Sequence, residues 1–118
     1  MKANELRIGN YVSVTWNGSS EITEIEQYHV RLKDGFSDIE SLRPIPLTKE
    51  WLLKFGFNAN RYNDEFELYP LMFDCEYTDH GEWNISYDGH PLSTEVKYVH
   101  QLQNLYFALT GEELTLKS

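Results

Sequence analysis

Carboxylates recur at alternate positions in three strand-like runs in the second half of the chain. The runs are 65–69, 73–77 and 82–88, and mostly apolar or aromatic residues occupy the positions between the acids. Because successive side chains of a β-strand point to opposite faces, a meander of these runs would gather six carboxylates on one face. These are Glu65, Glu67, Asp74, Glu76, Glu82 and Asp88. Such a face could bind a basic protein surface, imitate the phosphates of a nucleic acid, or hold a cation.

The ordinary interpretation of this alternation is an antiparallel sheet with one face in water. However, like charges opposite each other on neighbouring strands destabilise a sheet, by roughly a few tenths of a kcal/mol per pair. Water-exposed sheet faces usually include lysines, which relieve this repulsion. A face kept purely acidic therefore favours a binding role with a basic partner.

Charge is unevenly distributed along the chain. Of the 118 residues, 19 are Asp or Glu and 10 are Lys or Arg, which gives a net charge of −9. Residues 1–61 are neutral, so the whole excess falls in residues 62–118, and no Lys or Arg occurs between Arg61 and Lys97. Because nucleic-acid phosphates are bound mainly through Lys and Arg, direct nucleic-acid binding by residues 62–118 is disfavoured.

Residues that could hold a metal or act as a nucleophile lie in the same region. They are Cys75, Asp79, His80, Asp88 and His90. Zinc accepts all of these side chains, but their spacing matches no zinc signature, and the two Asp/His segments are typical of turns. The alternation places Cys75 inward, as a small core thiol. The chain also lacks a glycine-rich phosphate loop, an HExxH motif and a GxSxG motif, so we predict no catalysis, no metal and no cofactor.

The segment 98–109 has apolar residues at helical spacing and is followed by Gly111, which predicts a C-terminal helix. One side of this helix is rich in amides and nearly uncharged. It carries His100, Gln101, Gln103 and Asn104. These side chains could hydrogen-bond neighbouring backbone inside the domain. Alternatively they could form a protein–protein contact, since the centres of interfaces are poor in charge and rich in tyrosine.

The first half of the chain predicts four short strands. They span about 11–16, 21–26, 28–33 and 36–40. Asn17-Gly18 is the strongest short-range hairpin signal, because both residues tolerate the positive φ of a type I′ turn. Ile22 and Ile25 break the strict alternation of the second strand, which indicates a β-bulge. Four short strands in about 40 residues favour a small curled sheet or partial barrel.

The remaining segments complete an α+β fold. Residues 43–46 contain two prolines and form a stiff connector, and a short helix follows from a Thr48 N-cap to Gly56. We expect an N-terminal curled four-stranded antiparallel sheet, this helix, a second antiparallel sheet with a last strand near 92–96, and a C-terminal helix that covers the second sheet. We expect a single domain over residues 1–118, with subregions 1–47 and 48–118.

The composition indicates a cytoplasmic protein. Cys75 is the sole cysteine, so no intrachain disulfide can form, which suits a reducing compartment. Residues 1–5 lack the apolar run of a signal peptide, and no stretch of 18 apolar residues occurs.

Three stretches at the start, middle and end of the chain are distinctive. They are Lys2–Val12, Ile45–Thr48 with Trp51–Phe57, and Tyr98–Leu114. They resemble a family of small uncharacterised proteins from gut Bacteroidetes and their phages or mobile elements, and the resemblance implies provenance rather than an activity. Residues 58–95 lie outside it. Separately, residues 6–46 resemble small SH3-like barrels in the rhythm of their strands, an architecture that hosts many functions.

These observations favour a small acidic binding module that contacts a basic protein surface through its acidic sheet face. The alternative is a nucleic-acid-binding accessory protein that uses the SH3-like half, where His29, Arg31 and Lys33 project from one strand face beside Arg43. A small enzyme or a metal-dependent domain is the third possibility.

Overall fold

The computed structural model describes residues 1–14, 18–62, 64–74, 83–93 and 95–117. It contains two antiparallel sheets and a C-terminal helix, which confirms the predicted α+β class. The chain forms two compact units. Unit 1 is Met1–Ile45 with Tyr98–Glu113, and unit 2 is Pro46–Lys97 with the residues from Leu114 onward.

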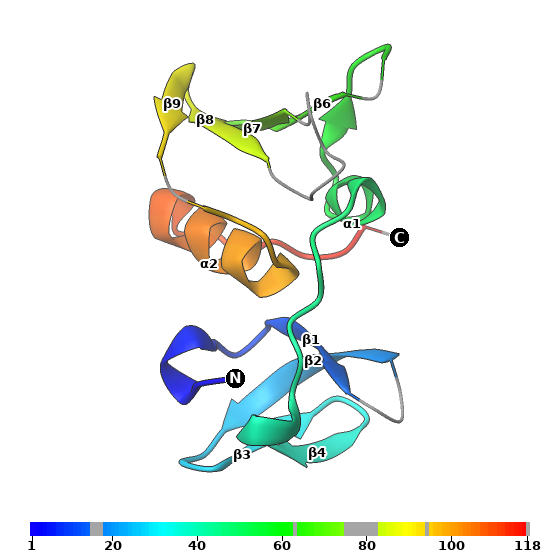
Figure 1. Ribbon diagram of the computed structural model, residues 1–118, viewed down its shortest axis with the longest axis vertical. Helices are drawn as coiled ribbons and strands as arrows, with labels where there is room; N and C mark the ends of the chain where they lie inside the picture. The colour runs from blue at the N-terminus through cyan, green and yellow to red at the C-terminus, as the bar shows by residue number, and fades with distance from the viewer. Residues whose placement is uncertain (15–17, 63, 75–82, 94, 118) are drawn as a thin grey trace. The chain divides into compact units, whose positions relative to one another are not determined.

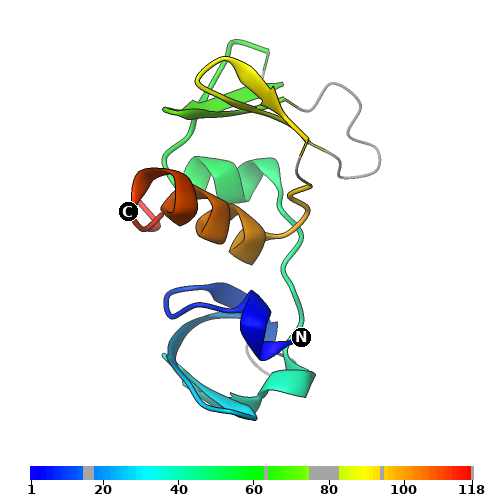
Figure 2. The same cartoon turned by 90° about the vertical axis from the view of Figure 1, so that its left-hand side faces the viewer.

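The sheet of unit 1 is a curled half-barrel. Its strands are β1 (Tyr11–Val14), β2 (Gly18–Ile25), β3 (His29–Leu32) and β4 (Gly35–Asp38), hydrogen-bonded in that order (Figure 1). Figure 2 shows how strongly these strands curve. The register shifts between Ile22 and Glu24, so the predicted β-bulge is confirmed, and a bulge increases the local twist of a strand. The predicted Asn17-Gly18 turn lies partly outside the described residues.

Alternation along these strands builds the core of unit 1. The buried cluster comprises Leu6, Val12, Val14, Ile22, Val30, Leu32, Ile39 and Leu42. Leu6 follows the short 3-10 helix η1 (Ala3–Glu5), and η2 (Ile39–Ser41) supplies Ile39. Alternation along the predicted strand 28–33 would place Tyr28 on the same inward face as Val30, but Tyr28 is exposed, because β3 begins one residue after it.

The C-terminal helix α2 (Val99–Thr110) has the predicted ends. The Gln101 side chain accepts a hydrogen bond from the Tyr98 backbone N–H at the start. Gly111, with φ 74°, ends the helix in the left-handed conformation that glycine adopts without strain. The sequence associated this helix with the second sheet, whereas the structure assigns it to unit 1. The buried Gln103 side chain explains the assignment, because it bonds to the backbone of Gly9 and Tyr11.

The chain leaves unit 1 after Ile45 and returns to it at Tyr98. On the unit 1 side, the Val99 N–H donates to the Ile45 carbonyl at 2.8 Å. On the unit 2 side, the Leu47 N–H donates to the Lys97 carbonyl at 2.9 Å. The outgoing and returning segments are thus held together at both boundaries, so unit 2 is largely an insertion between the first sheet and its helix.

Unit 2 begins with helix α1 (Lys49–Lys54), where the Thr48 side chain accepts a hydrogen bond from the Trp51 backbone N–H. Its sheet follows, in the order in which its strands occur in the chain. The strands are β5 (Asn58–Ala59), β6 (Glu65–Leu68), β7 (Leu71–Asp74), β8 (Asn84–Tyr87) and β9 (His90–Leu92), with β6–β9 labelled in Figure 1. The predicted turn at 78–81 lies outside the described residues.

Two tight turns shift the strands of unit 2 from their predicted positions. The turn at Tyr69-Pro70, whose peptide bond is cis, starts β7 at Leu71 rather than 73. Asp88 and Gly89 have φ 49° and 83° and form a two-residue hairpin turn between β8 and β9. The last strand is therefore His90–Leu92, not the predicted 92–96.

Aromatic packing fills the inner face of the unit 2 sheet. Phe66, Phe73 and Ile85 are aligned across β6, β7 and β8 and are buried. The Trp83 ring meets Phe66 and Phe73 edge-on, with each pair of centroids 6.1 Å apart. No helix in the described ranges is long and apolar enough to cross a membrane.

Candidate functional site

Three of the predicted carboxylates share the outer face of the unit 2 sheet. Glu65 and Glu67 flank the buried Phe66 on β6, and Asp74 follows the buried Phe73 on β7. The period of two therefore sorts these acids outward, as the sequence predicted. Glu76 and Glu82 lie outside the described residues.

The strand register places two of these charges directly against each other. Glu65 is paired with Asp74 across β6 and β7, and Asp74 is paired with Asn84 on the other side. Glu67 instead faces Met72. Like charges directly opposite each other on neighbouring strands are unfavourable, by roughly some tenths of a kcal/mol per pair.

No cation in the described part of the chain forms an ion pair with these three acids. The ion pairs found there join Arg7 to Glu113, His29 to Asp38, Arg31 to Glu24 and Lys97 to Glu95. Three of the four lie within unit 1. We call Glu65, Glu67 and Asp74 the acidic face.

Asp88 does not belong to the acidic face. The alternation placed it there, but its positive φ and the following Gly89 put it in the β8–β9 turn. Asp-Gly is a strong signal for such a turn, and here turn chemistry overrides the period of two. The Asp88 carboxylate instead interacts with Tyr69, where its negative charge, assisted by slight burial and a hydrogen bond to the hydroxyl, raises the pKa of that tyrosine.

A groove accompanies the acidic face along β5 and β6. It has a volume of about 430 Å³ and is lined by Asn58, Ala59, Asn60, Glu65, Glu67, Leu68, Tyr69 and Met72. Sequence reasoning singled out the two glutamates but missed the tyrosine and the asparagines. The sequence did contain a signal for Tyr69, because Glu65, Glu67 and Tyr69 occupy alternate positions along the chain.

The amide side of α2 is bonded inside unit 1. Gln103 is 0% exposed; its amide donates to the Gly9 carbonyl at 2.8 Å and accepts from the Tyr11 N–H at 2.9 Å. Asn104 accepts from the Asn10 side chain and donates to the Glu5 carbonyl, both at 3.0 Å. These bonds match the first interpretation of the helix, in which its amides satisfy neighbouring backbone.

His100 is buried on the same helix, and its ring stacks on that of Tyr98. Its Nδ1 is buried with no hydrogen-bond partner among the described residues. Burial lowers the pKa of His100 below 6.5, while the negative charge of Glu5 acts in the opposite direction. The imidazole is therefore neutral in the folded protein near pH 7.

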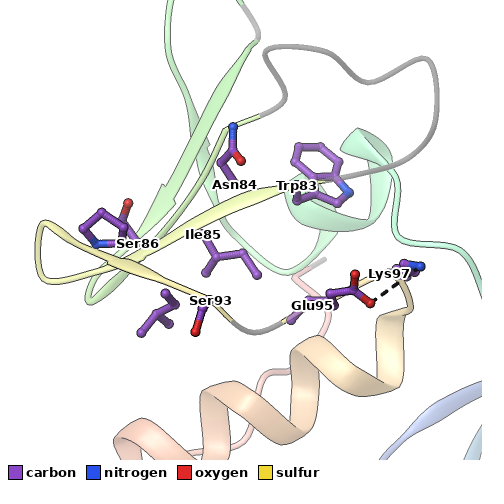
Figure 3. Close-up of a pocket in the computed structure, with 10 residues that line it drawn as sticks. Trp83, Asn84, Ile85, Ser86, Ser93, Glu95 and Lys97 are labelled. Carbon is purple, nitrogen blue, oxygen red and sulfur yellow. Dashed lines mark ion pairs between the residues drawn. The ribbon is translucent and has the colours of Figure 1, made fainter.

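A second pocket in unit 2 lies beside β8 and β9 and has a volume of about 480 Å³. Figure 3 shows the Trp83 ring and Ile85 on its wall, with Glu95 and Lys97 joined by an ion pair. The ion pair spans 3.6 Å, so the two charges among the lining residues largely cancel. The Trp83 indole N–H donates to the Leu47 carbonyl at 3.4 Å, which fits a packing role for this ring.

The basic residues of unit 1 are partly neutralised. Arg31 pairs with Glu24 at 3.0 Å and His29 pairs with Asp38 at 3.1 Å. Lys33 is exposed, and the Arg43 guanidinium donates to the Glu40 and Leu42 carbonyls. A smaller pocket of about 240 Å³ lies beside the exposed Phe36.

The residues considered for metal or nucleophile chemistry are mostly not described. Cys75, Asp79 and His80 lie outside the described residues, and His90 is exposed on β9. Within the ranges that the structure does describe, no group of three or more His, Cys, Asp or Glu side chains could hold a metal.

Comparison with known proteins adds no assignment. No protein-family model, curated protein or solved structure matches this chain.

The opposed pair Glu65 and Asp74 should show measurable repulsion in a double-mutant cycle. With Glu65→Gln and Asp74→Asn, we expect an unfavourable coupling free energy of about 0.2–1 kcal/mol that shrinks in high salt. The cycle of Glu67→Gln with Asp74→Asn is the matched control, because these residues are diagonal rather than opposite. Equal coupling in both cycles, measured by urea unfolding, would contradict the register.

His100 should make the stability of the protein depend on pH. The folded chain keeps this imidazole neutral, whereas the unfolded chain takes up a proton at a pKa of about 6.5. Its contribution to stability is therefore complete above about pH 6.5 and is lost as the pH falls below that value. His100→Gln should flatten the decline in the free energy of unfolding between pH 8 and pH 5. An unchanged slope would show that His100 does not titrate on unfolding.

Proposed function

We propose that this protein is a non-enzymatic binding module that contacts a basic protein surface through its acidic face. The observation that carries the proposal is the opposition of Glu65 and Asp74, with no lysine or arginine among the described residues paired to either. A lysine at a neighbouring outward position would relieve this repulsion within the fold. A cationic partner would relieve it from outside, and would gain electrostatic attraction in doing so.

The charge distribution supports the same partner. Unit 2 contains the whole stretch between Arg61 and Lys97, in which no Lys or Arg occurs. A field of one sign accelerates association with a partner of opposite charge, and salt weakens that effect. The proposed complex should therefore form quickly and weaken as ionic strength rises.

Nucleic-acid binding by unit 1 is the second candidate. It is supported by the exposed aromatic rings of Tyr28 and Phe36, since stacking rings beside basic residues bind single strands. The ion pairs of Arg31 with Glu24 and His29 with Asp38 weaken this candidate. A small enzyme ranks third.

We also propose an origin in phages or other mobile elements and a cytoplasmic location. The resemblance of Lys2–Val12, Ile45–Thr48 with Trp51–Phe57, and Tyr98–Leu114 to the family from gut Bacteroidetes supports the first. The single cysteine supports the second.

The test compares two variants with the same net charge. The face variant carries Glu65→Gln, Glu67→Gln and Asp74→Asn. The control variant carries Glu26→Gln, Glu40→Gln and Glu112→Gln, three exposed acids of unit 1. Basic proteins captured by the wild type from the native host should be identified by mass spectrometry, purified, and titrated against all three proteins.

We expect the face variant to lose at least about tenfold in affinity for such a protein, since three charge contacts are removed, while the control stays within about twofold of the wild type. Equal losses in the two variants would mean that binding follows net charge alone. Affinity unchanged in the face variant would refute the proposed function.

A further inference from the structure

We propose that the groove beside the acidic face receives an arginine side chain from an extended segment of the basic partner. This inference rests on the proposed function and deepens it, because it names the residue type that the surface recognises. Four features of the groove carry it: two carboxylates, an exposed aromatic ring two positions beyond the second of them in the sequence, apolar lining residues, and a hydrogen bond that holds the ring.

Two carboxylates and one ring border the groove at β6 and the turn that follows it. Glu65, Glu67 and Tyr69 occupy alternate positions and all three line the groove. Glu65 and Glu67 lie on β6, and Tyr69 follows in the β6–β7 turn. The Cα atoms of residues two positions apart lie at most about 7 Å from each other, so a guanidinium paired with Glu67 is within reach of the Tyr69 ring as well. An arginine can accept this geometry because its planar head pairs with a carboxylate and stacks on a ring at the same time.

The apolar lining residues of the groove suit the rest of the side chain. Met72 is opposite Glu67 and half-buried, and Ala59 and Leu68 add apolar surface. Arginine buries its three methylene groups along such surface while its head stays with the charges. Asn58 also lines the groove, and its side-chain amide offers hydrogen-bonding groups for an adjacent main chain. The Asn60 amide is used within the chain, where it donates to Asp64 and accepts from the backbone N–H groups of Asp64 and Glu65.

The ring of Tyr69 is exposed yet supported. It is 70% exposed, which leaves a face available for a cation. The Tyr69 hydroxyl donates a hydrogen bond to the Asp88 carboxylate of the β8–β9 turn, and the negative charge of that carboxylate raises the pKa of the tyrosine. Asp88 is thus a positioning residue for the Tyr69 ring. This gives Asp88 a role in the groove although it does not belong to the acidic face.

The chain already contains the arrangement that we propose for the complex. In unit 1 the guanidinium carbon of Arg7 lies 3.8 Å from the centre of the Phe107 ring, and the same guanidinium pairs with Glu113. An arginine held between a ring and a carboxylate is therefore a contact that this protein forms internally. Tyr69 and Glu67 present the same two groups to an outside arginine.

The experiment uses the full chain and two short peptides of equal charge, one alternating glycine with arginine and the other glycine with lysine. Dissociation constants are measured by calorimetry at fixed low salt. The wild type should bind the arginine peptide at least about threefold more tightly than the lysine peptide, since stacking on an exposed ring favours arginine. Tyr69→Leu should remove this preference and leave lysine-peptide binding within about twofold of the wild type.

Matched controls separate the ring from the charges. Tyr62→Leu changes an equally exposed tyrosine of unit 2, 69% exposed, that does not line the groove, and should leave the preference intact. Tyr69→Phe keeps the ring and should keep the preference. Glu67→Gln should weaken both peptides. Amide spectra of Phe66 and Phe73 report whether each variant is folded.

The outcomes distinguish the two proposals. If the wild type binds both peptides equally and Glu67→Gln weakens both, the acidic face binds basic segments but the arginine groove is refuted. If Tyr62→Leu removes the preference as fully as Tyr69→Leu, the groove is also refuted. If neither peptide binds, the arginine groove is refuted, and the titration of captured basic proteins against the face variant decides the proposed function separately. The comparison of arginine-peptide and lysine-peptide binding by the wild type tests the arginine groove even if Tyr69→Leu does not fold.

Discussion

The buried amide of Gln103 is the interaction on which the arrangement of the chain depends. It bonds to the backbone on both sides of Asn10, more than ninety positions earlier in the sequence. A buried backbone group that loses its partner costs about 1–3 kcal/mol, so these two bonds strongly favour one location for α2. A hydrogen bond between the Asn10 and Asn104 side chains extends the same network. The Arg7 guanidinium, which lies over the Phe107 ring, adds a further contact between α2 and the start of the chain.

This constraint makes unit 2 an insertion. Because α2 belongs with β1, the chain must leave unit 1 after Ile45 and return at Tyr98, and backbone bonds at Leu47 and Val99 hold the two passages together. The sheet of unit 2 has its own aromatic core around Phe66, Phe73 and Trp83. Its outer face is not needed for that core, which is why it can carry opposed carboxylates at small cost.

Local patterns predicted most of the elements, and non-local contacts account for the differences. Alternation predicted β1, β3 and β6, and the helix signals at Thr48 and Gly111 are confirmed. The period of two also sorted Glu65, Glu67 and Asp74 outward. It could not reveal that Gln103 bonds to Gly9, since amphipathic spacing does not identify which sheet a helix meets. Nor could it show that Asp88 supports Tyr69, because that contact joins two separate hairpin turns.

The central claim is that a basic partner is bound on the outer face of unit 2, along β5, β6 and β7. The most direct measurement is an amide chemical-shift titration of the labelled protein with a basic protein obtained by capture. The account predicts saturable shifts concentrated at Asn58–Ala59, Glu65–Leu68 and Leu71–Asp74, reversed by added salt. Saturable shifts centred instead on Arg31 and Phe36 of unit 1 would contradict it.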